Sequence, residues 1–95
     1  MHAIVSHVNL KPGRGDEAMK LLKEEVLPRA KEVGEPVAGY WARSVDGSQG
    51  VSIVLYASKE AADEALATMM AQGTPPPDAP VELGDAGVYE VLASA

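Results

Sequence analysis

The spacing of apolar residues switches between a two-residue and a helical period along this chain, and the order of these segments limits it to few folds. Residues 2–10 are rich in branched apolar side chains and lack helix breakers, which predicts a strand. From Asp16 to Val33 the apolar residues recur every three or four positions, which predicts a helix. Pro28 lies inside this stretch, but the apolar stripe keeps its phase across it, so we expect one bent helix rather than two.

The ends of this helix carry their own signals. Asp16 is suited either to the N-cap or to the first turn, where the helix dipole favours an acid. Gly34 is suited to the position just after the helix, which often adopts a left-handed conformation. The helix is therefore expected to end at Val33.

The rest of the chain supplies two further strands, a second helix and a final strand. Strands are predicted over residues 37–44 and 51–57, joined by a hairpin. Ser58 is expected to cap a helix over residues 59–72, which Gly73 ends. The remaining segments are an extended proline-rich loop and a broken fourth strand, at residues 74–80, 81–83 and 88–92, with Gly84 and Gly87 interrupting the strand.

The resulting order is βαββαβ. With right-handed crossovers, this order gives a four-stranded antiparallel sheet with both helices on one face, a ferredoxin-like α+β fold. A chain of 95 residues has the length of one domain, so residues 1–95 are expected to form a single unit.

The predicted strands are apolar on both faces. In the third strand Val51, Ile53 and Leu55 point one way, and Val54 and Tyr56 point the other. A sheet with one wet face alternates apolar with polar residues, and two helices cover only one face. A second copy of the same sheet is the simplest cover for the other face, so we expect a homodimer joined through its open sheet faces.

Composition excludes several classes of function. Lys and Arg number 8 against 14 Asp and Glu, a formal net charge of −6, which argues against nucleic acid and anionic membrane surfaces as partners. The chain has no Cys, which removes disulfides, thiolate metal sites and Cys nucleophiles. No apolar run approaches the ~20 residues of a membrane span. No secretory signal is recognisable, so a cytoplasmic location is expected.

Three stretches resemble the dimeric α/β-barrel superfamily, in particular its antibiotic-biosynthesis-monooxygenase-like proteins. They are the end of the first strand with its Lys-Pro-Gly turn, the Gly-Tyr-Trp strand, and the apolar strand that leads into the Ser-capped helix, at residues 8–13, 39–41 and 52–61. The resemblance implies a dimeric barrel and a range of activities that includes oxygenases without a cofactor. The positions that the haem-degrading branch would use hold Ser6, Ala65 and the proline-rich loop, which argues against haem degradation.

His7 is the candidate catalytic residue. It lies mid-strand, and an imidazole inside a barrel is suited to act as a general base near neutral pH. His2 is five positions away, so the two histidines point to opposite faces and cannot chelate one metal within a chain. Ser6 next to His7 likewise faces the other side, which excludes a nucleophile–base dyad. No metal or cofactor site is expected.

The aromatic residues of the strands have two interpretations. They pack in the core or the dimer interface, or some of them line a flat pocket for an aromatic or polyketide-like molecule. Tyr40, Trp41 and Tyr56 are the candidates for contact with such a substrate. Arg43 shares a face with Trp41 and is suited either to holding an anionic oxygen or to a salt bridge at the rim.

Three functions therefore compete. The first is a cofactor-independent monooxygenase-like enzyme in which His7 takes a proton from an aromatic substrate. The second is a non-catalytic ligand-binding or stress-related dimer. The third resembles the regulatory βαββαβ domains that bind amino acids near the turn after the first strand, a role with which Gly13 and Gly15 are compatible.

Overall fold

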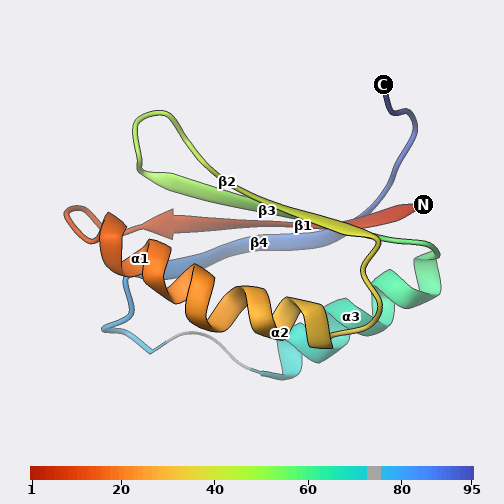
Figure 1. Cartoon of the computed structure of the whole chain (residues 1–95), viewed down its shortest axis with the longest axis horizontal. Helices are drawn as coiled ribbons and strands as arrows, with labels where there is room; N and C mark the ends of the chain where they lie inside the picture. The colour runs from red at the N-terminus through yellow and green to blue at the C-terminus, as the bar shows by residue number, and fades with distance from the viewer. Residues whose placement is uncertain (73–75) are drawn as a thin grey trace.

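The computed structural model describes residues 1–72 and 76–95 and contains one antiparallel sheet with helices on a single face (Figure 1). Its strands are β1 (His2–Leu10), β2 (Ala38–Arg43), β3 (Gln49–Tyr56) and β4 (Val81–Glu90). They lie side by side in the order β2-β3-β1-β4, and each neighbouring pair is antiparallel. This is the predicted α+β, ferredoxin-like arrangement.

The first helical stretch is continuous but not uniform. It consists of α1 (Gly15–Leu21), a π-helical segment η1 (Leu22–Val26) and α2 (Leu27–Glu32). Pro28 has no N–H to donate to the carbonyl of Glu24, so the regular ladder is interrupted there. The wider π turn just before it accommodates this, and the N–H of Leu27 donates to the carbonyl of Leu22. One helical stretch was expected, and its irregularity is a π segment.

The start and end of this stretch follow the sequence signals in part. Arg14 occupies the N-cap position without a side-chain cap, so Asp16 takes the second of its two predicted places, in the first turn. Gly34 has φ of +69°, the left-handed conformation expected of a glycine that ends a helix. Its position is crowded, because a Cβ there would lie 3.1 Å from Cε1 of Tyr56.

The second helix, α3 (Lys59–Ala71), begins as predicted. The hydroxyl of Ser58 accepts a hydrogen bond of 3.1 Å from the N–H of Ala61. The predicted end at Gly73 and the first part of the crossing loop, residues 74–75, lie outside the described residues.

The prediction of a broken fourth strand was wrong. β4 pairs with β1 along its length, and its irregularity is a β-bulge rather than a gap. Ser6 pairs with Ala86 and Val8 pairs with Leu83, so β4 carries one extra residue between these pairs. Of the two glycines interpreted as breaks, Gly84 lies in this bulge and Gly87 pairs regularly with Val5.

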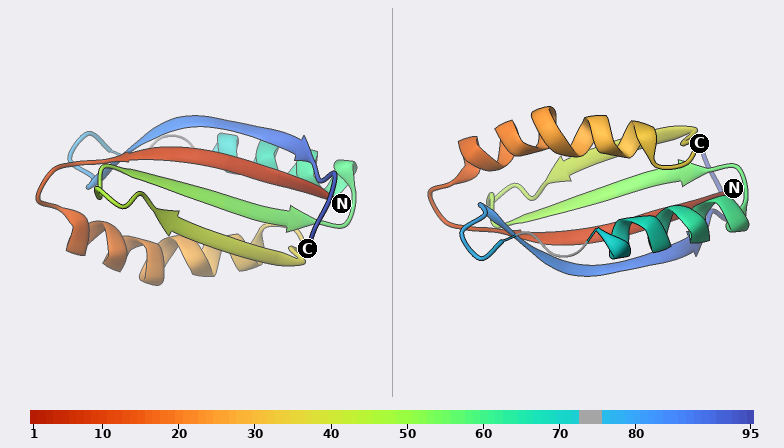
Figure 2. Two further views of the ribbon diagram at one scale, coloured as in Figure 1. Left: turned by 90° about the horizontal axis from the view of Figure 1, so that it is seen from above. Right: turned by 90° about the horizontal axis from the view of Figure 1, so that it is seen from below.

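The buried core lies toward the end of the sheet where β1 begins and β3 ends. Its members are Ile4, Val33, Val54, Tyr56, Ala62 and Ala65. Seen from below, α3 covers this end over β1 and β4, while the first helical stretch runs on the same face along the β2 and β3 side (Figure 2). None of the residues of α1, η1 and α2 is fully buried. The far end of the helix-facing layer is therefore less densely packed than the core.

Candidate functional site

The face of the sheet opposite the helices is mostly apolar, and no helix in the described part of the chain covers it (Figure 2). Strand register places on this face Ala3, Val5, His7 and Asn9 of β1, Gln49, Val51, Ile53 and Leu55 of β3, Ala38, Tyr40 and Ala42 of β2, and Glu82, Gly87 and Tyr89 of β4. We call this set the open face. Tyr40 is 62% exposed, Tyr89 56% and Ile53 37%. Large apolar side chains therefore remain accessible to water on this face.

His7 lies on this open face and is exposed. On one side it pairs with Val51 of β3, and on the other it faces the bulge formed by Gly84 and Asp85. A Cβ at Gly84 would lie 3.0 Å from the carbonyl oxygen of His7, so the two backbones approach each other closely. The bulge therefore lies directly against the backbone of the one predicted catalytic residue.

Tyr40 shares the open face with His7 but is not its neighbour. Tyr40 pairs with Ile53, and Ile53 pairs in turn with Val5, two residues before His7. Tyr89 lies on the same face at the other edge of the sheet, where it pairs with Ala3. The tyrosines thus flank the face from its two outer strands, and the imidazole lies between them on a central strand.

Trp41 and Arg43 lie on the helix-facing side. Trp41 packs against the buried cluster, and its ring lies over Gly39, where a Cβ would be only 2.7 Å from it. Arg43 reaches toward the start of α1, with its Nη1 3.6 Å from the position that a Cβ of Gly15 would occupy. The structure therefore does not bring these two side chains to His7.

Tyr56 is also on the helix-facing side, where it belongs to the core. It is 1% exposed, and its hydroxyl donates a hydrogen bond of 3.2 Å to the carbonyl of Val33. Burial raises the pKa of this phenol because it disfavours the charged phenolate. Packing and the hydrogen bond account for this residue without a ligand.

The remaining polar residues of β1 confirm the opposite orientation of neighbouring side chains. The hydroxyl of Ser6 contacts the hydroxyl of Ser52 across the strands on the helix-facing side. It makes no dyad with His7. His2 also lies on that side, in register with Tyr56, and its Nδ1 is buried without a hydrogen-bond partner among the described residues.

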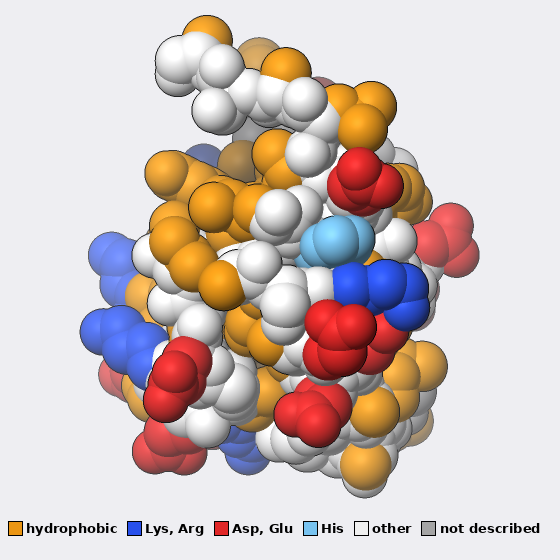
Figure 3. All heavy atoms as spheres, turned by 90° about the vertical axis from the view of Figure 1, so that its right-hand side faces the viewer, with side chains coloured by type: hydrophobic (Ala, Val, Ile, Leu, Met, Phe, Trp, Pro, Cys, Tyr) orange, Lys and Arg blue, Asp and Glu red, His pale blue; other side chains and the backbone are white. Residues whose placement is uncertain are grey.

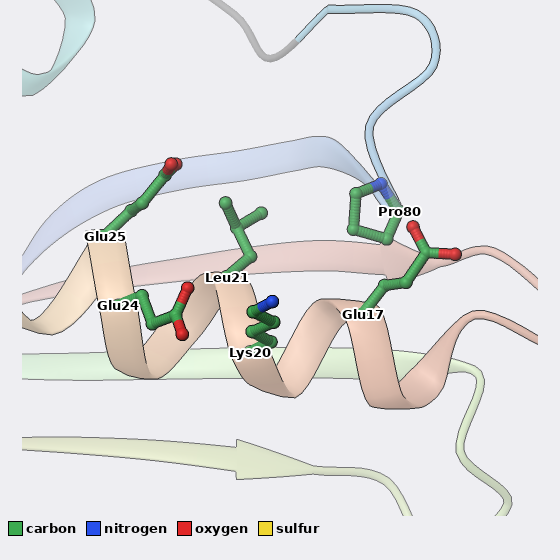
Figure 4. A pocket seen from close by; sticks show the side chains of 6 residues that line it. All are labelled: Glu17, Lys20, Leu21, Glu24, Glu25 and Pro80. Atoms are coloured by element: carbon green, nitrogen blue, oxygen red, sulfur yellow. The ribbon is translucent and has the colours of Figure 1, made fainter.

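A shallow groove of about 330 Å³ runs between the first helical stretch and the start of β4 (Figure 4). It is lined by Glu17, Lys20, Leu21, Glu24, Glu25 and Pro80. Next to Glu17, Arg14 ties the start of α1 to the loop before β4, because its Nη1 donates to the carbonyl of Asp78 at 2.6 Å and its Nη2 pairs with Glu17 at 2.6 Å. This pairing lowers the pKa of Glu17 and raises that of Arg14. None of the residues predicted for the site from the sequence lines the groove.

Charged side chains are unevenly distributed at one end of the molecule. At the end of the molecule where β1 begins, most acidic and basic side chains gather in the lower half of the view, where the helices lie (Figure 3). No three metal-ligating side chains converge within residues 1–72 and 76–95. In the same part of the chain, no helix is both long and apolar enough to cross a membrane.

Comparisons with known proteins support the fold. Neither family models nor curated proteins give a match to this sequence. Protein Atu4242 from Agrobacterium tumefaciens is similar in structure at 19% identity, with a TM-score of 0.64 over 95% of this chain and 92% of that one. HapK from Hahella chejuensis is similar at 13% identity, with a TM-score of 0.66 over 100% of this chain and 96% of that one. The chain thus shares the small α+β fold of both proteins.

Sequence reasoning did not place Asp85 opposite His7. The signal was present in the interruption of the fourth strand near Gly84, which was interpreted as a gap instead of an inserted residue. A bulge commonly re-aims a side chain beside a functional site. The open face therefore contains His7 with a carboxylate opposite it, in an otherwise mostly apolar surface.

Proposed function

We propose that this protein functions as a homodimer whose subunits join through their open faces, and that the enclosed space binds a small apolar or aromatic molecule. The observation that supports this is the exposure of Tyr40, Ile53 and Tyr89 on a face without a covering helix. Each large apolar side chain contributes ~1.5–3 kcal/mol when it leaves water, so their burial favours association. A second copy of the same sheet offers a surface of matching chemistry and shape.

A pair of charge substitutions tests the interface. Ile53→Asp places a carboxylate in the centre of the open face, and burying it unpaired costs several kcal/mol. We expect dimer affinity measured by sedimentation equilibrium to fall by ~100-fold or more. Met70→Asp is the matched control, because Met70 is 69% exposed on α3 and lies away from that face. A monomeric wild-type protein, or equal effects of the two substitutions, would contradict the interface.

The chemistry that fits a base in an apolar enclosure is cofactor-independent oxygenation. His7 takes a proton from an activated ring CH₂ of an aromatic substrate, and the resulting carbanion reduces O₂. One oxygen atom becomes the new carbonyl of the product and the other leaves as water, so the CH₂ group supplies the electrons. Tyr40 shares the face and is positioned to contact a flat ring, whereas Trp41, Arg43 and Tyr56 lie on the other side of the sheet.

The catalytic part is tested with a hydroxylated anthrone as the probe. We expect the wild-type dimer to convert it to the quinone faster than the uncatalysed reaction, and His7→Gln to remove most of that acceleration while the dimer persists. Trp41→Phe is the control, because Trp41 contacts the core side. Binding without conversion would assign the dimer to the non-catalytic ligand-binding class, and normal turnover by His7→Gln would exclude His7 as the base.

A further inference from the structure

Among the described residues, the bulge between β1 and β4 places a carboxylate-bearing residue opposite an imidazole-bearing one on the open face. Gly84 and Asp85 both lie opposite His7, because the pairing passes from Ser6–Ala86 to Val8–Leu83. Without the extra residue, regular pairing would set a single side chain there. The absence of a Cβ at Gly84 lets the backbones approach, since a Cβ would be 3.0 Å from the His7 carbonyl oxygen.

The surroundings of this pair are apolar. Val51 lies beside His7 on β3, and Val5 precedes it on the same face of β1. The other polar residues of the face, Asn9, Gln49 and Glu82, lie together farther along the strands. Among the described residues that strand register places on this face, His7 is the one side chain that can carry a positive charge.

In the single chain both side chains are exposed and no hydrogen bond joins them. Exposed pairs of this kind are worth little, because water solvates each partner. A second copy on the open face removes that water, and a buried carboxylate without a partner is then costly. Pairing with His7 is the arrangement within the chain that satisfies it.

We infer that Asp85 is the positioning residue of His7. When a second copy covers the open face, its carboxylate accepts a hydrogen bond from one imidazole nitrogen, which fixes the ring and its tautomer. The other nitrogen is left free to take a proton from a bound molecule. This inference rests on the proposed dimer and adds a residue to its site.

The tautomer provides a test that needs no substrate. The chain has two histidines, so ¹⁵N spectra of the imidazole rings contain two sets of signals, which His7→Gln assigns. In the wild-type dimer we expect His7 to show the separated shifts of a single neutral tautomer, and Asp85→Asn to change these ring shifts while those of His2 stay constant. Glu82→Gln is the matched control, because it removes a carboxylate from the same strand farther from His7.

A double-mutant cycle on the dimer dissociation constant tests the pair by a second route, even if Asp85→Asn weakens the dimer. His7→Gln and Asp85→Asn should each weaken association by ~10-fold, and the double variant should be no weaker than either single one. Additive losses of dimer affinity in the double variant would overturn the pairing of Asp85 with His7 but not the proposed dimer. Unchanged ¹⁵N shifts of His7 in an Asp85→Asn dimer would do the same. A change in the ¹⁵N ring shifts of His7 that is equally large in Glu82→Gln would also overturn the pairing. A monomeric wild-type protein would overturn the proposed dimer, and the pairing with it.

Discussion

The hydroxyl of Tyr56 donates a buried hydrogen bond to the carbonyl of Val33, at 3.2 Å, and so joins the last residue of β3 to the residue that follows α2. This carbonyl belongs to a helix end, where backbone acceptors lack partners within the helix. The phenol satisfies one of them in the interior, and its ring belongs to the same buried cluster as Ile4 and Val54. An aromatic residue that the sequence offered as a ligand contact is therefore part of the fold itself.

Tyr56→Phe tests the value of this hydrogen bond. The substitution keeps the ring but leaves the Val33 carbonyl without its donor, so we expect the free energy of unfolding to fall by ~1–2 kcal/mol in urea titrations. Tyr40→Phe is the matched control, because Tyr40 is 62% exposed, and its effect should stay within ~0.5 kcal/mol. Equal effects of the two substitutions would contradict the assigned role.

The raised pKa of Tyr56 also predicts a pH dependence in the alkaline range. The folded state binds the phenolic proton more tightly than the unfolded state. The resulting contribution of Tyr56 to the free energy of unfolding is therefore fully present below the unfolded pKa of ~10. It is lost as the pH rises through the folded pKa. The stability of the wild-type protein should therefore fall more steeply above pH ~10 than that of Tyr56→Phe. Parallel decreases of melting temperature would show that the phenol does not contribute.

Gly34 is constrained by its backbone and by its neighbour together. Gly34→Ala introduces a Cβ at φ of +69° and 3.1 Å from the Tyr56 ring. Gly47→Ala has the same kind of backbone cost at φ of +78° but open space around it. We expect Gly47→Ala to cost ~1 kcal/mol and Gly34→Ala clearly more, because Tyr56 must shift or its hydrogen bond must lengthen. Equal losses would mean that the Tyr56 ring yields freely.

Local signals predicted most of the fold, because they act within a few residues. The left-handed Gly34 and the capping Ser58 are specified by short-range chemistry, and both lie where the sequence placed them. The π segment before Pro28 and the bulge at Gly84 depend on what the neighbouring backbone does, so a single sequence did not define them.

The candidate site was harder to predict, because side-chain alternation assigns relative faces but not their surroundings. It separated Tyr40 from Trp41 correctly, and the structure then divides the predicted residues between the open face and the helix-facing layer. The position of Asp85 opposite His7 results from one inserted residue on a partner strand. Strand register, which no local pattern reports, decides such a juxtaposition.

Asp46 organises the hairpin between β2 and β3 and predicts an acid dependence. Its carboxylate accepts hydrogen bonds from the Ser48 N–H at 3.0 Å and from the hydroxyls of Ser44 and Ser48 at 2.7 Å. These bonds lower its pKa to about 2, with the Ser48 N–H as the largest cause. A lowered pKa means that the stabilisation is present above the unfolded pKa of ~4 and is lost as the pH falls through the folded value.

Asp46→Asn should therefore destabilise the protein at pH 6, and its melting temperature should approach that of the wild type between pH ~4 and ~2. Subtracting the variant's plot of melting temperature against pH from that of the wild type isolates the effect of Asp46, because both proteins share the other carboxylates. A difference in melting temperature that stays constant across this range would show that the carboxylate charge has no part in the hairpin.

The bulge at Gly84 is the last feature with a direct test. Gly84→Ala places a Cβ at 3.0 Å from the His7 carbonyl oxygen, and a backbone atom cannot rotate away as a side chain can. We expect a loss of ~1–3 kcal/mol in the free energy of unfolding and amide shift changes centred on residues 7 and 8. Gly87→Ala is the matched control, because a Cβ there meets the Tyr89 ring at 3.6 Å, an ordinary contact. Since strand interiors disfavour glycine, the control should be neutral or stabilising. If Gly84→Ala behaved in the same way, the close approach of β4 to His7 would not be needed to form the bulge.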